Sequence, residues 1–306
     1  MNTVAYVTVD VFTLERFVGN PLAVIPDARG GLSSDAMQKI AAEFGYSETT
    51  FVLPPENPDH TARVRIFTPT AEIPFAGHPN VGTAFVLGQQ QEIFGKPAGD
   101  RLIFEEDAGL VEVTLLRKGG NITGASIRAP GKLTVGDTIA PELIARCVQV
   151  GPQSIRTITH APTFASVGLP FAFAELDSLE TLGKAWPNAA IFVEAAARHK
   201  LDKTGFSLFL YVRSAENPWH IRARMFAPMD NVTEDPATGS ASAALGAYLT
   251  SLLPAQDAEV KITIEQGVEM GRRSVIGVEV RKSSGTVNEV LLSGSSVHVM
   301  RGEILL

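Results

Sequence analysis

Two residues that can transfer protons, His78 and Asp235, occupy the same place in a short repeated motif. The segments HPNVGTA (78–84) and DPATGSA (235–241) both fit the pattern x-P-x-x-G-[ST]-A. Histidine titrates near neutral pH and aspartate is a carboxylate, so the two side chains could carry out general acid–base catalysis. Taken singly, each could instead be a helix cap with its side chain in solvent. The repetition favours the functional interpretation.

Each copy of the motif predicts the start of a helix. Asp235 is a favoured N-cap residue and Pro236 suits the first helical position, an arrangement repeated at 78–79. A helix N-terminus carries about half a positive charge and unpaired N–H groups, so it binds carboxylates and developing oxyanions. Two such ends facing one cleft would form a pocket for a small anionic molecule. Gly82 and Gly239 form helices poorly, which suggests that exposed N–H groups or close packing are required there.

A second repeat lies upstream of the first and predicts an internal duplication. RVRIFTP (63–69) and RARMFAP (222–228) both fit R-x-R-x-F-x-P. The copies of this motif are about 159 residues apart and those of the first motif about 157, which predicts a two-residue deletion in one connecting loop. The Gly-Gly-Asn turn signal within 117–121 predicts the boundary. The predicted domains are residues 1–119, completed by 290–306, and residues 120–289.

The elements that must position these residues are mostly short strands. A serine cap and an apolar stripe predict one helix over 33–44, and two more helices are expected after His78 and Asp235. This mixture predicts an α+β fold with much antiparallel sheet rather than regular βαβ alternation. The strand-length apolar or alternating runs are 4–12, 50–53, 62–67, 101–106, 110–116, 164–169, 206–212, 260–265, 274–280 and 295–300.

Composition excludes several classes of function. The 306 residues carry a formal charge of −7 and no basic run, which argues against nucleic-acid or anionic-membrane partners. A single cysteine, Cys147, excludes internal disulfides and mechanisms that need two thiols. The six histidines show no metal-binding spacing, and no phosphate-binding glycine loop occurs, so neither a metal nor a nucleotide cofactor is expected. Without an apolar stretch of about 18 residues or a secretory leader, we expect a cytoplasmic protein.

Five segments together resemble the PhzF family of phenazine-biosynthesis isomerases. That resemblance implies the diaminopimelate-epimerase-like fold, an α+β architecture of two pseudo-symmetric domains. Each domain is a β-barrel around a central helix, with the active site in the cleft between them. The duplication inferred from the repeats agrees with this architecture. The five segments are GNPLAVI (19–25), YSETTFV (46–52), FTPTAEIPFAGHPNVGTA (67–84), EDPATGSASAAL (234–245) and QGVEMGR (266–272).

The resemblance also implies an activity: a metal- and cofactor-free isomerase that moves a proton between carbons of a small, cyclic carboxylated metabolite. In the characterised phenazine enzyme the substrate is trans-2,3-dihydro-3-hydroxyanthranilate, which is isomerised to a ketone. A homodimer is implied as well. The essential glutamate of the family matches Glu48, which would carry the proton, and partial burial would raise the pKa of its carboxyl group. His78 and Asp235 match the helix-start residues that orient the substrate and relay protons. Pocket residues match Gly77 and Ser240, and backbone N–H groups at 77–78 and 239–240, including that of Gly239, would hold the substrate carboxylate.

Two alternatives stay open from the sequence. The same scaffold could carry an epimerase or a dehydratase, although epimerases that use two thiols carry cysteines at the helix starts and this chain has none there. A catalytically silent member could instead bind a metabolite or a protein partner. Retention of Glu48, His78 and Asp235 disfavours a silent protein, because binding alone needs no group that transfers protons.

Overall fold

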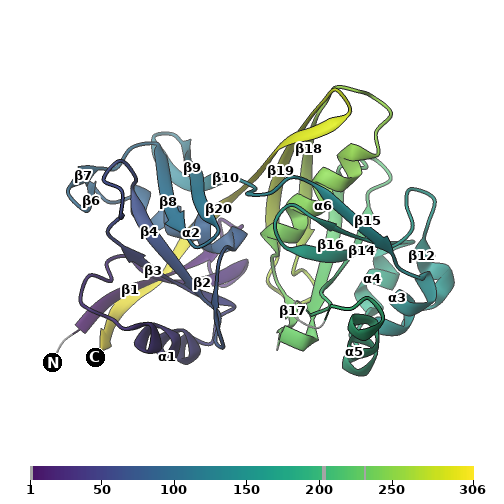
Figure 1. Ribbon diagram of the computed structural model, residues 1–306, viewed down its shortest axis with the longest axis horizontal. Coiled ribbons are helices and arrows are strands. Elements are labelled where there is room, and N and C mark those ends of the chain that lie inside the picture. Colours follow the sequence, from purple (N-terminus) through teal and green to yellow (C-terminus); the bar gives the residue numbers. More distant parts are fainter. Residues whose placement is uncertain (1–2, 202–204, 231) are drawn as a thin grey trace. The chain divides into compact units, whose positions relative to one another are not determined.

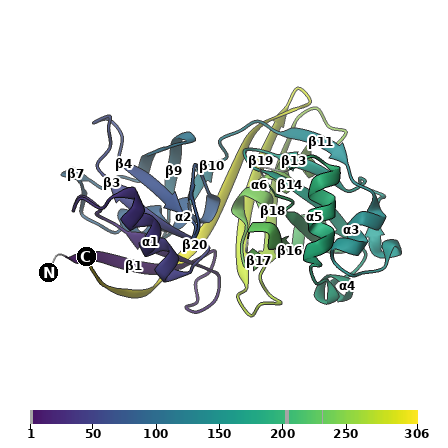
Figure 2. The same cartoon turned by 60° about the horizontal axis from the view of Figure 1, so that its bottom comes forward.

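The chain folds into two compact units, which Figures 1 and 2 show from two directions. Unit 1 contains Met1–Pro130 and Leu291–Leu306, and unit 2 contains Gly131–Val290. The chain therefore leaves unit 1 once and returns to it in its last strand. The structure, a computed structural model, describes residues 3–201, 205–230 and 232–306.

Eight strands of unit 1 form a closed barrel. They are β1 (Thr3–Val11), β2 (Asn20–Ile25), β3 (Glu48–Leu53), β4 (Ala62–Phe67), β8 (Arg101–Glu106), β9 (Gly109–Lys118), β10 (Asn121–Arg128) and the later part of β20 (Thr286–Leu305). Each is hydrogen-bonded to the next in that order, and β20 pairs with β1 to close the ring. The short β5 (Glu72–Ile73) pairs with β4, and β6 (Glu92–Ile93) pairs with β7 (Lys96–Pro97).

Helix α2 (Gly77–Gly88) lies inside this barrel. Every one of its residues is buried, and it contacts β1, β2, β3, β9 and β10. A helix that is apolar on all sides is stable only when it is enclosed in this way. Gly82 permits the close fit, because a Cβ atom there would lie 2.6 Å from Leu22 Cδ2 and 2.8 Å from Val11 Cγ2. Close packing therefore explains this glycine.

Helix α1 (Ser34–Phe44) packs outside the barrel, close to the range predicted from its cap and apolar stripe. Ser33 is the N-cap, and its hydroxyl accepts a hydrogen bond from the amide of Ala36 at 3.1 Å. Gly45 ends the helix in the left-handed conformation, with φ of 63°. Met37 and Ala41 form the buried face of the helix.

The sheet of unit 2 runs in the order β11, β13, β14, β15, β16, β18, β19. These strands are β11 (Thr134–Thr138), β13 (Thr163–Ser166), β14 (Pro170–Leu176), β15 (Leu208–Arg213), β16 (His220–Ala227), β18 (Ala258–Gln266) and β19 (Ser274–Ser283). The short β12 (Ile155–Arg156) pairs with β14, and β17 (Val232–Asp235) pairs with β16. Two 3₁₀ turns cover Pro152–Ser154 and Pro228–Asp230.

The helices of unit 2 lie on both faces of its sheet. Helix α6 (Gly239–Ser251) contacts β13, β14, β18 and β19, and most of its residues are buried. Helices α3 (Pro141–Cys147), α4 (Leu179–Lys184) and α5 (Ala189–Arg198) gather on the other face, as Figure 2 shows. A separate apolar cluster there joins these three helices to β14 and β15. None of these three helices was predicted from the sequence.

The two units repeat one topology, which confirms the internal duplication and the α+β class. In unit 1, β2 and β3 are parallel, β3 and β4 antiparallel, and β4 and β8 parallel. In unit 2, β14 and β15 are parallel, β15 and β16 antiparallel, and β16 and β18 parallel. In each unit a short strand and then a buried helix, β5 and α2 or β17 and α6, lie in the chain between the last two strands of the series.

The sequence predicts a domain boundary at residues 119–120, but the chain does not pass from unit 1 to unit 2 at this point. Gly119 and Gly120 form the tight turn that joins β9 to β10, both with positive φ. Both strands belong to the barrel of unit 1, which continues through Pro130. The Gly-Gly-Asn signal therefore marks a hairpin.

No helix in the described part of the chain is long and apolar enough to cross a membrane.

Candidate active site

The structure brings Glu48 and His78 together in unit 1. Glu48 is the first residue of β3, and His78 lies in the first turn of α2. His78 Nε2 lies 3.5 Å from Glu48 Oε2, and the two side chains are 5% and 16% exposed. A carboxyl group and an imidazole at this distance can exchange a proton through a small movement of either side chain.

The other ring nitrogen of His78 faces the amide of Asn20. Asn20 Nδ2 lies 3.4 Å from His78 Nδ1, at the start of β2, and Asn20 is fully buried. Burial lowers the pKa of His78 to about 3, and a backbone hydrogen bond with Pro21 opposes that shift. At neutral pH the buried imidazole is uncharged.

The start of α2 differs in register from the prediction. Ala76 is the N-cap residue, Gly77 is the first helical residue and His78 the second, so His78 is not a cap. The N-cap residue makes no side-chain hydrogen bond to this helix end, and no acidic residue lies in the first turn of the helix. The backbone N–H groups of the first turn therefore depend on groups outside the helix for compensation.

A further ionisable group, Glu106, lies close to the same helix end. Glu106 is the last residue of β8, and its two carboxyl oxygens are buried without a hydrogen bond to the described residues. Burial raises its pKa to about 8; the Asn80 amide works against the shift and Asp107 adds to it. Asn80, also on α2, donates from Nδ2 to the carbonyl of Ala76 at 3.0 Å. Nothing in the sequence singles out Glu106, because its burial depends on contacts between β8 and a distant helix.

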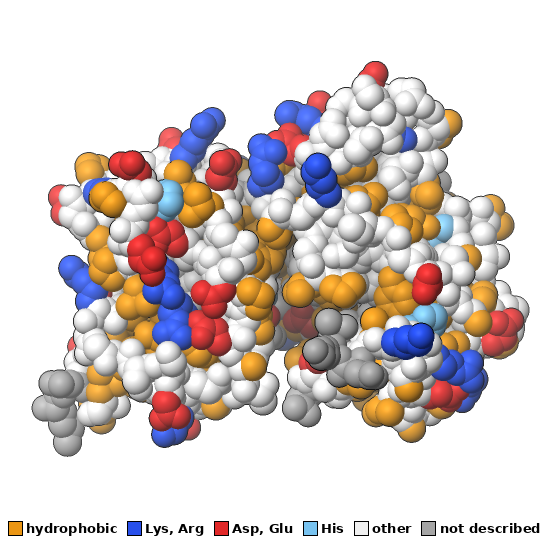
Figure 3. Space-filling model, in the orientation of Figure 1, with side chains coloured by type: hydrophobic (Ala, Val, Ile, Leu, Met, Phe, Trp, Pro, Cys, Tyr) orange, Lys and Arg blue, Asp and Glu red, His pale blue; other side chains and the backbone are white. Residues whose placement is uncertain are grey.

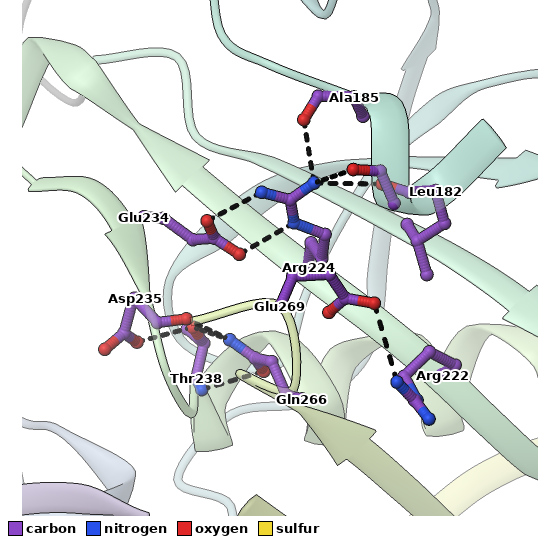
Figure 4. Close-up of polar contacts among 10 residues, drawn as sticks. Leu182, Ala185, Arg222, Arg224, Glu234, Asp235, Thr238, Gln266 and Glu269 are labelled. Carbon is purple, nitrogen blue, oxygen red and sulfur yellow. Dashed lines mark hydrogen bonds and ion pairs between the residues drawn. The ribbon is translucent and has the colours of Figure 1, made fainter. Parts of the chain in front are cut away.

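In unit 2, Asp235 is held in a small polar network, which Figure 4 shows. It ends β17, is 7% exposed, and its Oδ2 accepts a hydrogen bond from the hydroxyl of Thr238 at 2.6 Å. The side-chain amide of Gln266 donates to the backbone oxygen of Asp235 at 2.7 Å, and its Oε1 accepts from the amide of Thr238 at 3.0 Å. Gln266 therefore fixes the backbone of the Asp235 loop.

The prediction that Asp235 caps a helix is wrong. Asp235 is extended and pairs with Met225 of β16, as suits a residue that precedes a proline. Helix α6 begins at Gly239, with Thr238 as its N-cap and no side-chain cap. Ser240 is the second residue of that helix. Gly239 and Ser240 thus lie at an uncapped helix start, as Gly77 and His78 do in unit 1.

The fold therefore aligns the two copies of the repeat differently from the alignment of their shared letters. Met225 of β16 and Ile66 of β4 fill the same place in the R-x-R-x-F-x-P motif. Met225 pairs with Asp235 and Ile66 pairs with Ile73, so Ile73 is the counterpart of Asp235. The counterpart of His78, the second residue of α2, is Ser240, the second residue of α6. The shared letters x-P-x-x-G-[ST]-A therefore align positions that the fold does not superimpose. The two-residue deletion inferred from those letters is also wrong.

Several charged groups outside these networks form ordinary ion pairs. Arg63 lies 2.8 Å from Glu56, and Arg222 pairs with Glu265 and Glu269. On the face drawn in Figure 3, acidic and basic side chains are interspersed on each unit. In the described part of the chain, no group of three or more His, Cys, Asp or Glu side chains is arranged to hold a metal ion.

Comparisons with known proteins identify the family of this chain and several of its relatives. The family described as phenazine biosynthesis-like protein matches residues 9–302. An uncharacterised isomerase of Mesorhizobium japonicum is 37% identical over 313 residues, covering 100% of both chains. The trans-2,3-dihydro-3-hydroxyanthranilate isomerase of Pseudomonas aeruginosa is 34% identical over 305 residues, covering 98% of this chain and 99% of its own.

Solved structures agree. A PhzF-family phenazine biosynthesis protein from Bacillus anthracis matches with a TM-score of 0.85 and 25% identity, covering 100% of both chains. A hydroxyproline epimerase from Agrobacterium vitis, 12% identical with a TM-score of 0.63, covers 99% of this chain and 91% of its own, and shares the fold alone. The closed barrel around a buried helix and the duplicated topology are those of the epimerase-like fold. The relatives named above are isomerases, and so is this protein. The chain belongs to the PhzF family.

Proposed function

We propose that this isomerase moves a proton between two carbon atoms of a small, cyclic carboxylated metabolite, and that trans-2,3-dihydro-3-hydroxyanthranilate is the first substrate to test. The observation that carries the proposal is the approach of Glu48 to His78 at the uncapped start of α2. Relatives 34% identical over almost the whole chain are named as isomerases of that compound, which supports the choice of substrate.

In this proposal Glu48 removes a proton from a ring carbon. The electron pair of the broken C–H bond shifts the neighbouring double bond, and the proton returns from Glu48 to a second carbon, so no atom is gained or lost. The neutral imidazole of His78 hydrogen-bonds a polar substituent of the ring and relays a proton where a heteroatom needs one. Its low pKa suits this role, because an uncharged ring can donate through one nitrogen and accept through the other.

We assign the binding of the substrate carboxylate to the uncapped helix starts. Gly77 begins α2 and Gly239 begins α6, and the partial positive charge of such ends favours an anion. Asp235 and Ser240 would orient the hydroxyl and amino substituents of the ring.

The test is Glu48→Gln, assayed with trans-2,3-dihydro-3-hydroxyanthranilate in D₂O and read by mass spectrometry. General acid–base catalysis is worth about 10²- to 10⁴-fold, so we expect turnover to fall by about that factor. Substrate binding, measured by calorimetry, should stay within about threefold, since the amide keeps the shape of the side chain. Glu43→Gln, an exposed change on α1, is the matched control.

The outcomes separate the alternatives. Retained turnover in Glu48→Gln would overturn the assignment of Glu48. Deuterium at the carbon next to the carboxylate, without a shift of the double bond, would indicate an epimerase, and loss of water would indicate a dehydratase. Binding without any deuterium incorporation by the wild-type protein would indicate a catalytically silent member.

A further inference from the structure

The second arginine of each R-x-R-x-F-x-P motif makes the same set of contacts. In unit 1, Arg65 donates from Nε and Nη2 to the two carboxylate oxygens of Glu72, each at 2.6 Å. Its guanidinium carbon lies 5.1 Å from the centre of the Phe67 ring. This two-pronged ion pair, supported by an aromatic face, is a geometry that arginine provides and lysine cannot.

In unit 2, Arg224 repeats the arrangement. It donates from Nε and Nη2 to Glu234, each at 2.8 Å, and lies 4.8 Å from the centre of the Phe226 ring. We call the Arg65–Glu72 and Arg224–Glu234 pairs the clamps. They are a feature of the duplication that the fold preserves, whereas His78 and Asp235 are not equivalent positions.

Each clamp is set at a fixed distance from the buried helix. The arginine and glutamate are 7 residues apart in unit 1 and 10 apart in unit 2. Despite this difference, Glu72 precedes Gly77, and Glu234 precedes Gly239, by the same number of positions. The glutamate therefore keeps its place relative to the helix start, and the connection before it absorbs the change in length.

The clamp of unit 2 is the more deeply buried. The side chains of Arg224 and Glu234 are 4% and 8% exposed, against 16% and 29% for Arg65 and Glu72. Arg224 Nη1 also donates to the carbonyls of Leu182 at 2.9 Å and Ala185 at 2.7 Å, at the end of α4 (Figure 4). The arginine thus joins β16, β17 and α4. A buried ion pair with so many hydrogen bonds tolerates little displacement of its partners.

Glu234 is the residue directly before Asp235. Successive side chains of a strand point to opposite faces, so the clamp fixes β17 from one face and leaves the Asp235 carboxylate on the other. There Asp235 accepts a hydrogen bond from Thr238, while Gln266 holds its backbone. Movement of Glu234 would consequently move Asp235 and the loop that leads into α6.

We propose that Arg224 is a positioning residue: through Glu234 it fixes Asp235 and the start of α6 in the geometry that the reaction requires. Arg65 has the equivalent role for the start of α2. The inference rests on the proposed function, in which Asp235 orients the substrate.

The kinetic test is a double-mutant cycle between Arg224→Lys and Asp235→Asn, with trans-2,3-dihydro-3-hydroxyanthranilate as the substrate. Lysine keeps the charge but cannot make the two-pronged contact, so we expect kcat/KM to fall by about tenfold. In the Asp235→Asn background, the same change should cost less than about twofold, because the residue that it positions is already altered. Arg222→Lys is the matched control on the same strand, where the arginine makes longer ion pairs of 3.4 and 3.5 Å.

Equal losses in both backgrounds would overturn the inference and leave the proposed function intact, since the effect would then be merely structural. Wild-type kcat/KM in Asp235→Asn would overturn both. Hydrogen–deuterium exchange gives a readout that needs no substrate: Arg224→Lys should speed exchange in residues 232–240, and Arg222→Lys should not. Unchanged protection there would overturn the inference. If Arg224→Lys fails to fold, Glu234→Gln, which preserves side-chain volume, takes its place.

Discussion

Glu106 offers a test of the buried chemistry that depends on no substrate. Its carboxyl group is buried beside Asn80, and this burial raises its pKa from 4.5 to about 8. One pKa unit corresponds to about 1.4 kcal/mol, so the folded state favours the protonated group by about 5 kcal/mol. Because the folded pKa is the higher one, this stabilisation is complete below pH 4.5 and is lost as the pH rises towards 8.

The perturbation is Glu106→Gln, which keeps the size of the side chain and cannot ionise. Free energies of unfolding would be measured by urea titration from pH 5 to pH 8 for both proteins. Relative to the variant, the wild-type protein should lose about 4 kcal/mol across this range, because the unfolded chain releases the proton while the folded protein keeps it. Subtracting the variant removes the pH dependence of every other group.

Glu112→Gln, an exposed change on β9, is the matched control and should follow the wild-type curve. Parallel pH curves for wild type and Glu106→Gln would refute the reasoning, because Glu106 would then titrate alike in the folded and unfolded chain. If Glu106→Gln lost more stability than the wild-type protein between pH 5 and pH 8, the effect would have the opposite sign to the one predicted.

The remaining predictions concern three other sites. Burial raises the pKa of Cys147 to about 12, so the native protein should resist iodoacetamide at pH 8 and react in urea; rapid native alkylation would contradict this. The pKa of His78 is about 3, so its ring resonances should not titrate between pH 8 and pH 5 in NMR spectra, and a midpoint near 6 would show the ring to be accessible. In Gly124→Ala the new Cβ would overlap the backbone oxygen of Gly294, which should lower the free energy of unfolding by roughly 3 kcal/mol in urea titrations; wild-type stability would refute the close approach of β10 and β20.

Local sequence signals predicted what is decided locally. Alternating apolar residues predicted β9 and β18, whose inward-facing side chains are buried at every second position. Ser33 predicted the start of α1, because an N-cap acts within its own turn. The missed helices α4 and α5 begin after Ser178 and Asn188, but only α4 has a side-chain cap, and both are short.

The wrong predictions in the site concern features that depend on pairing between strands. Asp235 and Pro236 have the residue types of a helix start, yet pairing with β16 extends β17 through Asp235 and delays the helix. The pairing of the two arginine clamps likewise depends on the hairpins that follow each strand. The resemblance to the PhzF family, by contrast, was carried by several segments spread along the chain, and the comparisons confirm it.

The return of β20 to unit 1 has a consequence for the order of folding in the cell. Residues 291–305 supply the strand between β1 and β10, and the ribosome makes them only after all of unit 2. Until then β1 and β10 each present an unpaired edge, the kind of surface that recruits other chains. During synthesis, unit 1 therefore stays an open sheet until its final strand emerges. We expect the nascent chain to depend on chaperones mainly during this interval.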